Sequence, residues 1–191
     1  MAHFTDGTNA FTADKGLTRA VTPKFHSVVF GDGYEQRAIR GINNFDESYS
    51  FNFNNRTSTE ANNIISFFES KNGVTLFVFA PPHLGSKTAT TSFSGTTITS
   101  SGLDTTVLSP STPSHILITD STDNDGGYTL DQTSANSATT LTTIASLTTE
   151  TDTANVVIQA GIAVVCQTWN HNYAYDGFYT VTGTFRRVYE P

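Results

Sequence analysis

The sequence predicts a mainly β protein, a β-sandwich or barrel with one α-helix, that carries an inserted small antiparallel β-barrel domain. Three observations support this fold class. A run of large side chains alternates with polar ones near residue 50, a single apolar stripe at helical spacing follows it, and a long Ser/Thr-rich segment contains short β-prone runs between turn clusters. The chain of 191 residues is 37% hydrophobic, which is enough for a core.

The stretch NFDESYSFNF predicts a strand with one buried face, because large side chains occupy every second position. The residues on this face are Phe45, Glu47, Tyr49, Phe51 and Phe53. The preceding stretch KFHSVVF (24–30) also predicts a strand.

A helix follows, since Thr57 and Glu60 have the spacing of a capping box. The positions that repeat at i, i+3, i+4 and i+7 form one apolar stripe of Ala61, Ile64, Ile65 and Phe68. Gly73 is expected to end the helix. The apolar run 74–79 then predicts a buried strand that ends at two prolines.

Residues 84–159 differ in composition and predict the inserted acidic β domain. In the stretch 86–159, 33 of 74 residues are Ser or Thr, and this stretch carries −6 of the net charge of −7. The cluster STDNDGG predicts a hairpin turn with positive φ at residues 124–127. The flanking regions 21–83 and 160–191 share a composition, so we expect them to form one discontinuous β domain.

The first 20 residues are polar with isolated aromatics, which predicts an N-terminal arm that becomes ordered on a neighbouring chain. Phe4 and Phe11 are its candidate anchors. No apolar run approaches the ~20 residues that span a bilayer, and the start lacks the pattern of a signal peptide. We therefore expect a soluble protein made in a cytoplasm.

The octapeptide FGDGYEQR (30–37) offers three interpretations: a phosphate loop, a metal turn, or a tight turn between strands. The pair of glycines lacks the third glycine of a dinucleotide site and the Lys-Ser/Thr of a P-loop, so a turn is favoured. Its candidate interface residues are Phe30, Gly31, Asp32, Gly33, Tyr34, Gln36 and Arg37. We expect Phe30 and Tyr34 to pack, and Gln36 and Arg37 to face a partner.

The remaining sequence shows no catalytic or metal-binding pattern. The five histidines have no ligand spacing, and TDNDGG lacks the glutamate that closes an EF-hand. Asp46 and Glu47 are adjacent on a strand and point to opposite faces, so they cannot act as a carboxylate pair. Cys166 is alone and is expected to be buried. The sequence predicts no enzyme, no cofactor and no metal, and the net charge argues against a nucleic-acid-binding surface.

Three stretches together resemble the minor tail protein M family of long-tailed bacteriophages, which is related in fold to the distal tail proteins. They are VVFGDGYEQRAIRGIN, the region YSFNFNNRTSTEANNIISFFESKNGVTLFVFAPP, and the closing VVCQTWNHNYAYDGFYTVTGTFRRV. The likeness covers residues 20–83 and 160–191, and the insertion departs from the short form of the family.

The resemblance implies a tail-tube-like domain and a structural role in the virion, at the distal end of a phage tail assembled in the bacterial cytoplasm. Such proteins form a homo-oligomeric ring, usually a hexamer, between the tail tube protein and the hub of the tail tip or baseplate. The ring would surround the tape-measure protein and later, transiently, DNA, with no membrane involved. Two alternatives remain open. One is a carbohydrate- or host-surface-binding module that acts through the insertion, and the other is a tail-associated hydrolase.

Overall fold

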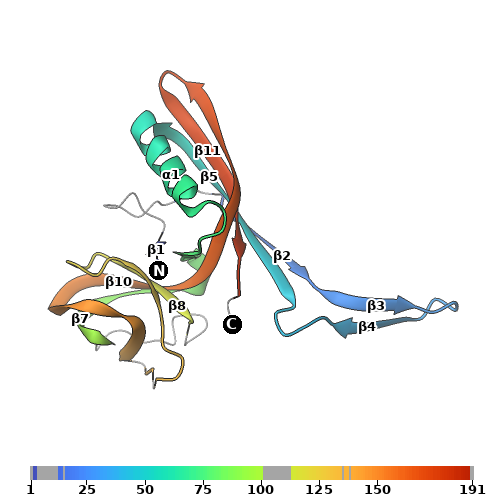
Figure 1. Ribbon diagram of the computed structural model, residues 1–191, viewed down its shortest axis with the longest axis horizontal. Coiled ribbons are helices and arrows are strands. Elements are labelled where there is room, and N and C mark those ends of the chain that lie inside the picture. The colour runs from blue at the N-terminus through green and yellow to red at the C-terminus, as the bar shows by residue number, and fades with distance from the viewer. Residues whose placement is uncertain are drawn as a thin grey trace. The chain divides into compact units, whose positions relative to one another are not determined.

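The computed structural model describes residues 2–3, 13–14, 16–100, 113–134, 136–137 and 139–189 (Figure 1). The chain forms two units. The helix unit consists of Thr12–Val74 and Val165–Pro191, and the Ser/Thr-rich unit consists of Met1–Phe11 and Thr75–Val164. The prediction of a mainly β fold with one α-helix is confirmed.

The helix unit contains an antiparallel sheet in the order β10-β11-β5-β2. Its strands are β2 (Thr18–Pro23), β5 (Phe45–Thr57), β11 (Phe178–Arg187) and the last part of β10 (Thr140–Tyr175). As predicted, β5 buries every second side chain from Glu47 to Phe53, whereas Phe45 at its start is exposed. The central β5 lies between β2 and β11 and pairs with both in antiparallel orientation.

The helix α1 (Ser58–Lys71) covers the apolar face of this sheet. Its capping box is formed as predicted: Thr57 accepts from the Glu60 backbone N–H, and the Glu60 carboxylate accepts from the Thr57 N–H at 2.9 Å. The helix ends next to the predicted stop: Asn72 is the left-handed C-cap with φ 51°, and Gly73 comes directly after it. Asn tolerates this conformation at a helix end, and Gly73 follows it with φ +65°.

The buried stripe of α1 packs on β5 and β11. Ala61, Ile64 and Phe68 are fully buried, and Ile65 lies at the edge of the stripe. The Phe68 ring contacts Phe51 at a centroid distance of 5.5 Å and Trp169 at 5.6 Å. Besides β5, the helix packs against β11.

The Ser/Thr-rich unit contains β6 (Phe77–Phe79), β7 (Ser86–Thr99), β8 (His115–Thr119), β9 (Gly126–Thr129) and most of β10, with a short 3₁₀ turn at Pro82–Leu84. The predicted strand 74–79 is shorter than expected, because residues 74–76 form a turn in which Val74 is 79% exposed. The short β1 (Ala2–His3) pairs in parallel with β6.

The strands of this unit curl around one hydrophobic cluster. β10 pairs with β7 and with β8, β8 pairs with β9, and a bridge from Leu130 to Thr143 returns to β10. The cluster consists of Phe93, Ile98, Ile116, Ile118, Leu130, Leu141, Leu147, Val156 and Ile158. This arrangement is compatible with the small barrel predicted for residues 84–159, which stays a prediction.

The loop between β8 and β9 is held by buried polar side chains. The Glu150 carboxylate accepts from the backbone N–H groups of Thr122 (3.0 Å) and Asp123 (2.9 Å), and from the Asn124 side chain. The prediction of positive φ at residues 124–127 is wrong, because Asp120 adopts it instead (φ 63°). Asn124 can stay outside the left-handed region because its side chain exchanges two hydrogen bonds with the backbone of Thr148.

The described parts of residues 1–20 pair with other parts of the same chain. β2 begins at Thr18 and pairs with β5, and the Asp14 carboxylate accepts from Arg56 (2.5 Å) and from the Asn54 N–H (2.6 Å). Residues 14 and 18–20 are therefore ordered by the chain itself rather than only by a neighbour. Phe4 and Phe11, the predicted anchors of the arm, lie outside the described residues.

Candidate assembly surface

The octapeptide 30–37 forms a tight turn between β3 (Phe25–Val29) and β4 (Glu35–Ile39), as predicted. The Phe30 N–H donates to the Tyr34 carbonyl (2.7 Å), and the Gly33 N–H donates to the Phe30 carbonyl (3.0 Å). Gly33 has φ +82°, which explains the glycine at this position. A Cβ on Gly31 or Gly33 would meet no atom within 4 Å, so close packing requires a glycine at neither position.

The hairpin β3–β4 is a two-stranded sheet of its own, and it continues outward from β2 and β5 (Figure 1). Every residue from 25 to 43 is exposed. The prediction that Phe30 and Tyr34 pack is wrong, because they are 51% and 75% exposed. Nothing within the described chain covers these side chains, since the turn that carries them is at the far end of the hairpin.

Both faces of the hairpin expose large apolar side chains. The register pairs Phe25 with Ile39 on one face, and it places Val28 opposite Gln36 on the other. The exposed apolar set of the hairpin and its base is Phe25, Val28, Val29, Phe30, Tyr34, Ile39 and Ile42. A two-stranded hairpin is only marginally stable in water on its own, and exposed apolar side chains on both of its faces mark it as a candidate interaction site.

The charged groups of the hairpin are at its surface. Arg37 donates to the Glu35 carboxylate at 2.6 Å, and this hydrogen bond holds the pKa of Glu35 below its usual value. Asp32 and Gln36 are exposed as well. Because the Arg37–Glu35 pair is exposed, it adds little stability. The expected contact of Gln36 and Arg37 with a partner stays a prediction.

The base of the hairpin is tied to the sheet by backbone and side-chain contacts. The Lys24 N–H donates to the Asn44 carbonyl (2.6 Å), and the Arg40 N–H donates to the Lys24 carbonyl (3.2 Å). Lys24 also pairs with Asp46 at 2.5 Å. Lys24 alone connects β2 to β3, whereas the connection from β4 to β5 contains three residues, 41–43, between the two partners of Lys24, and of these Gly41 has φ +74°. The hairpin is therefore joined to the sheet through one irregular step.

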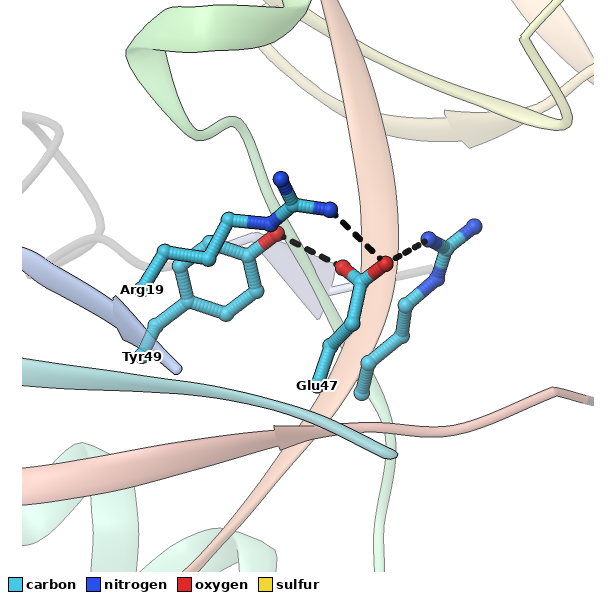
Figure 2. Close-up of polar contacts among 4 residues, drawn as sticks. Arg19, Glu47 and Tyr49 are labelled. Atoms are coloured by element: carbon cyan, nitrogen blue, oxygen red, sulfur yellow. Dashed lines mark hydrogen bonds and ion pairs between the residues drawn. The ribbon is translucent and has the colours of Figure 1, made fainter. Parts of the chain in front are cut away.

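A buried carboxylate lies two residues beyond the start of β5 and connects three strands. Glu47 Oε1 accepts from Arg19 of β2 (3.0 Å) and from Arg187 of β11 (3.1 Å), and Oε2 accepts from the Tyr49 hydroxyl (2.9 Å). Figure 2 shows Arg19 and Tyr49 converging on the Glu47 carboxylate. This Glu47 cluster fixes the two strands from which the hairpin leaves.

The ionisation of the Glu47 cluster follows from these contacts. Burial disfavours the Glu47 charge, but the hydrogen bonds from Arg19 and Tyr49 and the charge of Arg187 outweigh it and lower the pKa of Glu47. Burial, together with the hydrogen bond to Glu47, raises the pKa of Tyr49 to about 12. Glu47 is therefore a carboxylate and Tyr49 a neutral donor at neutral pH. The sequence placed Glu47 on the buried face and on the opposite face from Asp46, but it did not indicate these partners.

The described residues contain no cluster of three or more side chains suited to bind a metal ion. Cys166 is buried as predicted, and burial raises the pKa of its thiol to about 11, which makes it unreactive. In the described part of the chain, no helix has the length and apolar character needed to cross a membrane.

Comparison with protein families gives a match to the family described as phage minor tail protein, over residues 8–109. The matched region includes the hairpin, β5 and α1. No curated protein matches the chain. The match covers more than half of the sequence. It contains the first two of the three stretches that resembled a tail protein, whereas the closing stretch lies outside it. The chain therefore belongs to the phage minor tail protein family, a family of structural virion proteins of the phage tail.

Proposed function

We propose that the protein forms a ring, with six copies as the expected number, at the distal end of the phage tail. The ring joins the tail tube protein to the hub of the tail tip or baseplate. It surrounds the channel that holds the tape-measure protein and that DNA later crosses. In this role the protein has no catalytic activity.

The exposed hairpin is the observation that carries the proposal. At about 150 Å² per fully exposed large side chain, and with 51% to 98% of each residue exposed, its seven apolar residues together present on the order of 700 Å² over the two faces. A stable interface buries roughly 800 Å² on each partner. The apolar surface of the hairpin is therefore close in size to one side of a subunit contact, and the hairpin extends away from the sheet that anchors it.

The charge distribution also supports a conduit. The net charge of −7 disfavours retention of DNA, which carries one negative charge per ~1.7 Å of helix axis. The outward face of the sheet bears hydroxyl and amide side chains, such as the hydrogen-bonded pair Ser50 and Thr184.

The alternative of a carbohydrate-binding insertion finds less support. Sugar sites normally stack on exposed aromatic rings. The two aromatic residues between 84 and 159 are Phe93, which is buried in the core of the Ser/Thr-rich unit, and Tyr128, which packs against that core.

A complementation experiment tests the ring. Phage that lack the gene are supplied with the wild-type chain or with Val28→Asp/Ile39→Asp, which places one charge on each face of the hairpin. We expect the variant to stay folded by circular dichroism but to yield no complete tails by electron microscopy. The control is Val74→Asp, an exposed apolar position outside the hairpin, which should give normal titres. Normal titres from the hairpin variant would refute the proposal.

A further inference from the structure

The proposed ring requires a surface that receives the hairpin of the neighbouring copy. A closed ring uses heterologous contacts, in which one patch of each subunit binds a different patch of the next. The hairpin is one of these patches, and the second must also be exposed and apolar.

Exposed apolar side chains outside residues 21–45 gather at one place in the described helix unit. Val74 is a single exposed side chain in a turn, and Tyr189 stacks on Arg187. By contrast, Tyr173 and Tyr175 near the end of β10 are 63% and 60% exposed and are two residues apart, on the same face of the strand.

Further aromatic rings extend this surface around the turn from β10 to β11. Tyr179 contacts His171 at a centroid distance of 4.9 Å and Tyr173 at 5.4 Å, and Phe178 contacts Tyr175 at 5.9 Å. We call this set the aromatic tip: His171, Tyr173, Tyr175, Phe178 and Tyr179.

The turn of the aromatic tip is also held by contacts within the chain. The turn residues Asp176 and Gly177 have φ 44° and 80°, as in the tight turns that match the twist of a hairpin. The Gly177 N–H donates to the Tyr173 hydroxyl at 3.2 Å. Tyrosines held in this way provide contact area at a low entropic cost, which is why they are enriched at interfaces.

The hairpin and the aromatic tip lie at opposite ends of β5. The first residue of β5, Phe45, pairs with Pro23 next to the hairpin, and the last, Thr57, pairs with Phe178 of the aromatic tip. Thirteen residues of strand separate these ends, which is about 40 Å at ~3.3 Å per residue. In Figure 1 the β3–β4 hairpin and the turn from β10 to β11 lie at different ends of the ribbon. Within one chain the two surfaces do not meet, so they are suited to a head-to-tail contact between copies.

The charges of the two segments are complementary. Residues 24–43 contain Lys24, Arg37 and Arg40 against Asp32 and Glu35, a net charge of +1, whereas residues 169–179 contain Asp176 alone. Lys24 and Arg37 already have carboxylate partners in the chain, which leaves Arg40 as the candidate to meet Asp176.

From these observations we propose that the hairpin of each copy docks on the aromatic tip of the next copy in the ring. This inference rests on the proposed ring and names the receiving surface. The occupant is a second copy of this chain, because the two surfaces agree in apolar character, have opposite charge and point away from each other along one strand.

Native mass spectrometry of the purified full chain tests the contact with two variants. The hairpin variant is Val28→Asp/Ile39→Asp, and the tip variant is Tyr173→Ser/Tyr175→Ser. We expect rings from the wild type and from the Val74→Asp control, and monomers from either variant alone. A 1:1 mixture of the two variants should give heterodimers and nothing larger, because one intact hairpin meets one intact aromatic tip.

The other outcomes separate the two proposals. If the tip variant still forms rings while the hairpin variant is monomeric, the aromatic tip is not the receiving surface and the ring stands. If the mixture stays monomeric, the hairpin does not bind the aromatic tip of another copy. If the hairpin variant forms rings, or the wild type stays monomeric at millimolar concentration, both the contact and the proposed ring are wrong. Circular dichroism of each variant verifies that it is folded.

Discussion

Truncation of Phe68 to alanine tests how the helix unit is held together. Phe68 is fully buried. The centroid of its ring lies at most 6.0 Å from the ring centroids of three aromatic residues on three different strands: Phe51, Trp169 and Phe185. Its removal leaves a cavity that these rings cannot fill without moving the sheet. We expect a loss of about 3–5 kcal/mol in the free energy of unfolding, the range for buried Phe→Ala changes.

The neighbouring Phe67 provides a matched control, because it is the same residue type on the same helix but is only half-buried and lies against Lys71. Phe67→Ala should cost roughly 1 kcal/mol. Urea unfolding followed by Trp169 fluorescence reports this unit, since Trp169 is the single tryptophan of the chain and lies against Phe68. For a domain of this size, the Phe68→Ala melting temperature should fall by at least about 12 °C. Equal losses for the two variants would refute the packing of α1 on β5 and β11.

Three further predictions concern polar contacts and close packing. Glu47→Gln should cost about 1–3 kcal/mol in urea unfolding, because two arginines lose a charged acceptor but stay partly solvated. Because folding lowers the pKa of Glu47, the ionised carboxylate stabilises the folded state fully at pH values above 4.5, the ordinary pKa of the group. This stabilisation is lost as the pH falls through the lowered pKa of the folded state. The wild type and Glu47→Gln should therefore converge in stability in acid. Glu150→Gln should lower the melting temperature of the Ser/Thr-rich unit with the same dependence on pH. If the melting temperatures of the wild type and Glu150→Gln still differ in strong acid, the Glu150 carboxylate is not the group that stabilises the β8–β9 loop. Gly183→Ala should cost about 1–3 kcal/mol because its Cβ would lie 2.6 Å from the Phe51 ring, whereas Gly31→Ala, in open space, should change stability by less than about 0.5 kcal/mol.

Local patterns in the sequence were sufficient for the elements that depend on neighbouring residues. The Thr57–Glu60 capping box, the alternation along β5 and the turn at 30–37 each depend on contacts within a few residues, and each was predicted correctly. Gly73 was expected to end the helix and follows the C-cap with positive φ, but the sequence alone did not show that Asn72 would be the left-handed cap.

Features that depend on distant residues could not be predicted in this way. Glu47 binds Arg187, which is 140 residues away, and no spacing rule connects them. The exposure of Phe30 and Tyr34 was missed for a related reason. Aromatic residues that flank a turn normally indicate packing, but here the hairpin extends beyond the sheet and no described part of the chain covers it.

The Glu47 cluster also explains how every copy can present its hairpin in the same position. A buried carboxylate contributes less stability than a well-packed apolar side chain would, so its value lies in the arrangement that it requires. If β2 moved by one residue along β5, Arg19 would turn to the opposite face of the sheet and Glu47 would lose a partner in a buried site. The register of β2 is thereby fixed, and with it the point at which the chain leaves the sheet after Pro23 to form the hairpin. In a closed ring, any error in the direction of the subunit contacts adds up from copy to copy. An apolar residue at position 47 would not disfavour a slipped register of β2, because it would lose no charged partner. We therefore infer that Glu47 serves the uniform geometry of the proposed ring more than the stability of the single subunit.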